Sequence, residues 1–180
     1  MAYNFKQRQW FYHEYQKTIE WGYFGRIVGD WLYLDNRAKK RPFAPPEEAF
    51  SKFIEERATW LLENKNMRGR THEQLCAALR DTRTAINAEI DQRLDILKEE
   101  RQRGITAPNS LAISKLDPHL LRLVHDEGHF RTGNELRHAP DEVIKAIPGI
   151  DNKKLGQVRK IFPKVVIPAP RPQPSLFATD

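Results

Sequence analysis

The chain has 180 residues, a formal net charge of +6 and a single cysteine, Cys76, so an intramolecular disulfide is excluded. Charged residues make up 30% of the chain and hydrophobic residues 39%, a balance that favours a long solvated helix or loosely joined pieces over one large core. The positive balance favours anionic partners, nucleic acid among them.

Residues 1–41 hold more than half of the aromatic side chains. Apolar and aromatic positions recur there at helical spacing and predict a helix over residues 6–22, as the series Phe11, Tyr15 and Ile19 illustrates. Glycines at 22, 25 and 29 weaken the pattern, so residues 27–34 are either a short strand or a further helical turn. The aromatic side chains form either the core of a small domain or a docking surface for single-stranded bases or a protein partner.

A basic, proline-rich connection over residues 36–46 precedes a helical region that spans residues 46–104. Its first helix is predicted to begin at Pro46, because proline suits a first turn and Glu47 and Glu48 are favourable at the positive end of the helix dipole. The apolar face of this helix runs from Phe50 to Leu61.

The central helix is predicted to begin after Thr71, which forms a capping box with Gln74, and to end at Gly104. About 30 residues give it a length of about 45 Å. It carries one narrow apolar stripe: Leu75, Leu79, Thr82, Ile86, Ile90, Leu94 and Leu97. Such a stripe needs a partner, which is either the preceding helix folded back as an antiparallel hairpin or a second copy of the chain in a coiled-coil homodimer.

Residues 105–114 are interpreted as a linker, residues 115–163 as a small helical domain, and residues 164–180 as a proline-rich tail. Within the small domain, Pro140 begins a helix that Pro148 and Gly149 end. Asn152 is predicted to cap the next helix. A tight hairpin between two helices leaves backbone N–H groups unpaired, and those groups can face a phosphate oxygen.

The run over residues 139–162 resembles the helix-hairpin-helix motif of many DNA-binding proteins. Residues 116–162 are similar, in the order of their elements, to the C-terminal domain of the bacterial RNA polymerase α subunit. The resemblance implies that this unit binds DNA across the minor groove and contacts regulators, with residues 150–154 on the nucleic-acid backbone. Lys153 and Lys154 match the phosphate-contacting positions best.

Two departures from these families are visible. Asp151 stands where the general motif has a second glycine, and its carboxylate would face the phosphate unless it points away or caps the helix. The segment from His119 to Arg122 lacks the Arg-Ser-x-Asn element that enters the groove in the α-subunit family. The candidate nucleic-acid contacts are therefore the hairpin, its following helix and two flanking cations: Arg122, Gly149, Ile150, Asn152, Lys153, Lys154 and Lys160.

His125 and His129 are four residues apart, a spacing that can ligate zinc on a helix. We interpret them instead as solvated histidines and expect no metal and no cofactor. Cys76 lies among apolar residues and is expected to be a buried, inert thiol. No phosphate-binding glycine loop or nucleophile elbow is present, so we expect a protein without enzymatic activity.

Two functions remain open. The first is a nucleic-acid-binding protein, with duplex DNA favoured and a role near transcription, for which a basic face should link Arg122, Lys153, Lys154 and Lys160. The second is a protein-interaction adaptor, for example a viral protein that binds a host machine, for which Trp10, Trp21 and Trp31 should form an exposed apolar patch. The sequence has no apolar run long enough to span a membrane and no secretory signal, so we expect no membrane partner and a cytoplasmic location, in a bacterium or an infected host cell.

Overall fold

The computed structural model describes residues 3–37, 46–67 and 69–165, which contain helices and no strand. The predicted all-α class is confirmed. The basic connection at residues 38–45 and the tail from residue 166 lie outside the described residues. The helices, in chain order, are α1 (Phe5–Tyr15), α2 (Gly22–Arg37), α3 (Pro46–Asn64), α4 (His72–Gln102), η1 (Ala107–Asn109), α5 (Pro118–Arg122), η2 (Leu123–Glu127), α6 (Gly133–His138), α7 (Asp141–Lys145) and α8 (Asn152–Ile161).

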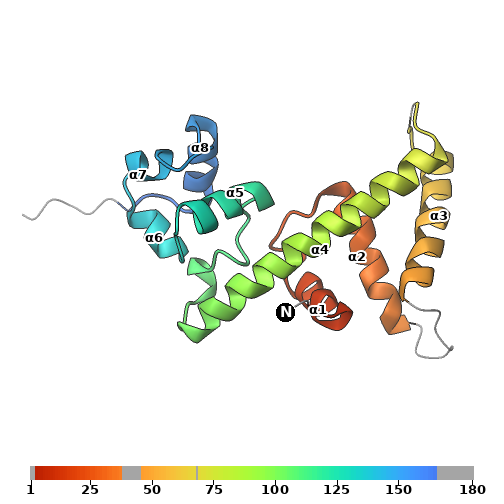
Figure 1. Ribbon diagram of the computed structural model, residues 1–180, viewed down its shortest axis with the longest axis horizontal. Coiled ribbons are helices and arrows are strands. Elements are labelled where there is room, and N and C mark those ends of the chain that lie inside the picture. The colour runs from red at the N-terminus through yellow and green to blue at the C-terminus, as the bar shows by residue number, and fades with distance from the viewer. Residues whose placement is uncertain (1–2, 38–45, 68, 166–180) are drawn as a thin grey trace, which may run out of the picture.

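Helix α4 runs diagonally through the molecule, with α1, α2 and α3 along one part of it and the short C-terminal helices at its other end (Figure 1). The predicted capping box begins it: the Thr71 hydroxyl accepts from the Gln74 N–H at 3.2 Å, and the Gln74 side chain accepts from the Thr71 N–H at 3.0 Å. Gly104, at φ +68°, follows the helix as predicted.

The predicted single helix over residues 6–22 is wrong. Helix α1 ends at Tyr15, whose carbonyl accepts from the N–H groups of Thr18 and Ile19 in a tight turn that returns Ile19 to the core. Residues 22–37 form the separate helix α2, so the alternative of a strand at 27–34 is wrong as well.

The glycines of α2 serve its packing against α1. A Cβ on Gly29 would lie 2.2 Å from the ring of Tyr12, and the Tyr12 hydroxyl donates to the carbonyl of Gly25 at 3.0 Å. Glycine lets the two helices approach closely enough for this ring to fill the space between them. Gly29 therefore sits inside a helix because the contact with α1 leaves no room for a side chain. A Cβ on Gly25 would lie 2.7 Å from the Cβ of Trp21 and 3.3 Å from Ile86 of α4.

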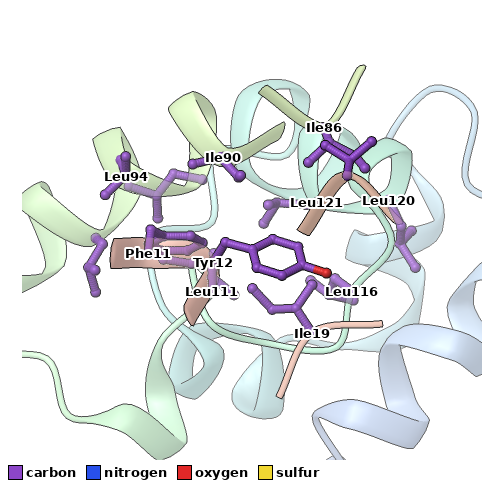
Figure 2. Packing of buried hydrophobic residues seen from close by; sticks show 14 of the residues in the cluster. Phe11, Tyr12, Ile19, Ile86, Ile90, Leu94, Leu111, Leu116, Leu120 and Leu121 are labelled. Atoms are coloured by element: carbon purple, nitrogen blue, oxygen red, sulfur yellow. The ribbon is translucent and has the colours of Figure 1, made fainter. Parts of the chain in front are cut away.

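The apolar stripe of α4 is buried within a single chain. The residues that cover it come from α1, α2, α3 and the segment after α4. Figure 2 shows Phe11 and Tyr12 of α1 and Ile86, Ile90 and Leu94 of α4 in one cluster with Leu111, Leu116, Leu120 and Leu121. The core is thus shared by both ends of the molecule, in contrast to the expected loosely joined pieces. A homodimer through α4 stays a prediction.

The segment expected to be a linker is held against α4 by the fully buried Arg93. Its guanidinium donates to the carbonyls of Ala112 at 2.9 Å, Ser114 at 3.1 Å and Leu116 at 2.6 Å. The Arg93 Nε–H donates to the Glu89 carboxylate at 2.8 Å, which places a counter-charge beside the buried cation.

Glu100, two turns further along α4, holds the same segment from its other end. Its buried carboxylate accepts from the hydroxyl of Ser110 and from the N–H groups of Leu111, at 2.5 Å, and Ala112. Arg93 and Glu100, here called the backbone clamp, satisfy main-chain groups that would otherwise be buried without partners.

Candidate nucleic-acid interface

Helices α7 and α8 are joined by a tight hairpin over residues 146–151. Gly149 has φ +87°, in the left-handed region that favours glycine, and the N–H of Ile150 donates to the carbonyl of Ile147 at 3.1 Å. The side chains of Ile147 and Ile150 are buried. Ile150, a candidate contact, therefore anchors the hairpin in the core, and its N–H is used within the hairpin rather than offered to a ligand.

The predicted cap of α8 is wrong by one residue. Asp151, in an extended conformation, is the N-cap, and its carboxylate accepts from the Lys154 N–H at 2.7 Å, whereas Asn152 is the first residue of the helix. This hydrogen bond, together with the nearby lysine charges, holds the pKa of Asp151 below its ordinary value. The acidic side chain thus faces the start of its own helix.

The Asp151 cap uses the N–H group of Lys154, which was expected to face a phosphate, but other N–H groups of the hairpin stay available. Within the part of the chain that the structure describes, the backbone N–H groups of Gly149, Asp151 and Asn152 have no acceptor. These three groups lie close together in the chain, within residues 149–152, where the hairpin ends and α8 begins. They are the donors that a phosphate oxygen can use here.

Lys154 connects the hairpin to α5. Its ammonium donates to the Gly149 carbonyl at 2.5 Å and lies 3.4 Å from Nε2 of His119. Lys153 is exposed and forms no side-chain hydrogen bond or ion pair within residues 3–37, 46–67 and 69–165. One lysine therefore supports the hairpin, while its neighbour is available to a ligand.

Lys160 extends this positive surface along α8. Lys153 and Lys160 are seven residues apart, so they share one face of the helix. Lys160 and Lys115 line the same hollow of about 580 Å³, in which Asp117 and Glu20 are the acidic neighbours. We call Lys115, His119, Lys153, Lys154 and Lys160 the basic face.

Arg122 lies at the border of the basic face. It follows His119 by three residues on α5, so the two side chains are neighbours on that helix. Arg122 also lines a second hollow, together with residues of α2 and α4. Arg122 is therefore placed between the basic face and the N-terminal helices.

Arginines elsewhere in the C-terminal unit are structural. Arg159 pairs with Asp141 at 2.7 Å and donates to the carbonyls of Leu136 and Ala139, both at 2.6 Å. The guanidinium of Arg137 donates to the Pro108 carbonyl and the Asn109 side chain. These cations hold loops, which leaves the lysines as the charges open to a partner.

One of the two histidines, His125, differs from its interpretation as a solvated side chain. His125 is buried, with Nδ1 2.7 Å from the Asp126 carboxylate and Nε2 2.9 Å from the Arg131 guanidinium. A neutral ring protonated at Nδ1 satisfies both contacts. His129 is exposed at φ +56°. Among the described residues, no three or more His, Cys, Asp or Glu side chains form a group that could hold a metal ion.

The apolar patch expected for the adaptor function is not formed by its three tryptophans. Trp10 is 43% exposed, but Trp31 is buried against Phe5 and Phe50, and Trp21 is half-buried. Tyr23, at 49% exposure, is instead the most exposed ring among the large hydrophobic side chains of residues 3–32. The sequence did not single out Tyr23 among the aromatic residues, because only its surroundings in α2 distinguish it.

Across the described ranges, none of the helices combines the length and the apolar character that crossing a bilayer requires. No protein-family model matches the chain, and neither a curated protein nor a solved structure is significantly similar to it.

Proposed function

We propose that residues 115–163 bind the sugar-phosphate backbone of duplex DNA and that the protein has no enzymatic activity. The observation that carries the proposal is the position of Lys153 and Lys160 on one exposed face beside a hairpin with three unpaired N–H groups. Cations and helix-start N–H groups together suit a phosphate oxygen. The resemblance to the helix-hairpin-helix motif and to the α-subunit domain supports the same role, as does the overall charge of +6.

Contacts of this kind give affinity with little sequence discrimination. The charges of the basic face are mainly lysines, which act as point charges for phosphate. A role near transcription in the cytoplasm, as expected from the sequence, is compatible with such binding. Pairing of two chains would raise the affinity through effective concentration.

The test is the affinity of the full chain for a short labelled duplex, measured by fluorescence anisotropy over a range of salt concentrations. We expect the double-logarithmic slope to be about −0.9 for each phosphate that is neutralised. The variant Lys153→Glu/Lys160→Glu should bind at least about tenfold more weakly at low salt and lower the slope by about 2. Lys154 is left unchanged, because it also holds the Gly149 carbonyl.

The matched control is Lys52→Glu/Lys98→Glu, which makes the same change in net charge at exposed positions of α3 and α4. It should retain most of the affinity. Equal losses in the two double variants would show that only net charge matters, and would overturn the proposed interface. Absence of binding at low salt to duplex DNA and RNA alike would favour the protein-interaction adaptor.

A second prediction concerns the Asp151 cap. Asp151→Gly removes a negative charge from the start of α8, where the phosphate is proposed to bind, and releases the Lys154 N–H. The affinity for duplex should therefore rise about two- to fivefold. Asp151→Asn keeps a capping side chain and should give a smaller gain. Anisotropy titrations at one salt concentration measure both variants. A fall in affinity in both would mean that the phosphate does not lie at the start of α8.

A further inference from the structure

A hollow of about 720 Å³ lies where the start of α2, the middle of α4 and α5 meet. Trp21, Tyr23 and Phe24 provide aromatic surface to it, and the 49% exposure of Tyr23 leaves much of that ring without a protein partner. Tyr23 and Phe24 also line a separate, smaller hollow, to which Arg70 contributes. Exposed aromatic rings between two cations are the arrangement that stacks bases of a single strand.

The hollow contains a carboxylate that is held in place. The side chain of Glu89 is only 10% exposed, and its Oε1 accepts from Arg93 at 2.8 Å, while Oε2 has no donor among the described residues. Burial raises the pKa of Glu89. The indole Nε1 of Trp21, which lines the same hollow, is buried and likewise has no partner in the described part of the chain. The walls therefore have unmet hydrogen-bonding capacity.

The charges around this hollow favour, as its ligand, an anion with a polar aromatic group over a simple cation. Arg93 already offsets the charge of Glu89, and Arg122 adds a second positive group at the hollow. Arg122 also neighbours His119, which contacts Lys154 in the basic face. A strand that leaves the basic face at Arg122 thus arrives at the aromatic rings.

We propose that this hollow binds one unstacked base of a single strand, with an exocyclic amino group donating to Glu89 and the adjacent phosphate at Arg122. The inference rests on the proposed function and adds a ligand class to it, since it makes the protein a binder of duplex with an adjoining single strand. Cytosine, adenine and guanine have the amino group. Thymine has a carbonyl oxygen at the ring position where cytosine has its amino group, and a carboxylate repels that oxygen.

The experiment compares short labelled oligo-deoxycytidine and oligo-deoxythymidine on the full chain by anisotropy. The wild type should bind the cytidine oligomer about tenfold more tightly than the thymidine oligomer. Tyr23→Leu should weaken both by about tenfold, because stacking is tolerant of base identity. Glu89→Gln should abolish the preference, because an amide can donate to the thymine carbonyl.

Leu62→Ala is the control, since it removes an exposed apolar side chain of α3 that is not an aromatic ring, and it should leave both affinities unchanged. Circular dichroism identifies a variant that fails to fold, and Tyr23→Leu tests the site even where Glu89→Gln does not fold. Equal wild-type affinity for the two oligomers, or an unchanged affinity in Tyr23→Leu, would overturn the inference. Binding of duplex by wild type and by Lys153→Glu/Lys160→Glu is measured separately. A failure of the proposed function appears in the duplex titrations, and a failure of this inference appears in the single-strand titrations.

Discussion

Replacement of Arg93 by leucine should lower the free energy of unfolding by about 3–5 kcal/mol. The change leaves the carbonyls of Ala112, Ser114 and Leu116 without their donor and leaves the carboxylate of Glu89 without its counter-charge. Groups that are buried without partners account for most of this cost, because the leucine side chain still fills part of the apolar volume. Urea unfolding followed by far-ultraviolet circular dichroism measures the effect.

Arg80→Leu is the control for Arg93→Leu, since Arg80 is an exposed arginine on the same helix. We expect a change within about 0.5 kcal/mol there. A loss below about 1 kcal/mol in Arg93→Leu would contradict the prediction. It would mean that water reaches the three carbonyls and replaces the guanidinium.

Removal of the other half of the backbone clamp should also be costly. Glu100→Ala leaves the buried N–H of Leu111 and the hydroxyl of Ser110 without an acceptor, at a cost of about 1–3 kcal/mol. Glu100→Gln keeps an acceptor and should cost less. Thermal and urea unfolding of the three proteins at one pH gives the order, and an alanine variant as stable as wild type would contradict it.

The contribution of Glu100 to the free energy of unfolding should depend on pH. Burial raises the pKa of Glu100 above its ordinary value, so the folded state binds this proton more tightly than the unfolded state does. The Glu100 contribution to stability is therefore largest below pH 4.5, the ordinary value, and is lost as the pH rises through the raised pKa. The stability of wild type minus that of Glu100→Gln should fall over this window. A difference that is constant with pH would contradict the assignment.

Local signals were sufficient for the limits of α4. Thr71 and Gln74 are three residues apart, and their reciprocal hydrogen bonds depend on little beyond that spacing. The glycines at 25 and 29 misled the prediction of α2, because the side chains that would meet a Cβ there come from outside the helix: Tyr12 at Gly29, and Trp21 and Ile86 at Gly25. A pattern within one segment contains no information about a side chain that arrives from elsewhere.

The same limit explains what was missed nearer the candidate interface. Arg93 and Glu100 follow Ile86 at steps of seven residues, so their spacing places them beside the apolar stripe, but their charge favoured a solvated position. Only the return of residues 105–116 over α4 buries them. The cap of α8 was ambiguous because Asp151 and Asn152 are adjacent and both residue types cap helices well. Lys153, Lys154 and Lys160 could be named in advance because charge and helical spacing are local properties, whereas Lys115 was missed because only the folded chain brings it beside Lys160.

The backbone clamp also affects how this protein can change in evolution. Within residues 110–116, Arg93 and Glu100 bind main-chain atoms and the Ser110 hydroxyl, so most of these contacts do not depend on which side chains occupy that segment. Point substitutions there are constrained by packing alone, whereas an insertion or deletion would shift every carbonyl away from its donor. We expect the segment to have a fixed length in homologues, and Arg93 to change only together with its counter-charge Glu89.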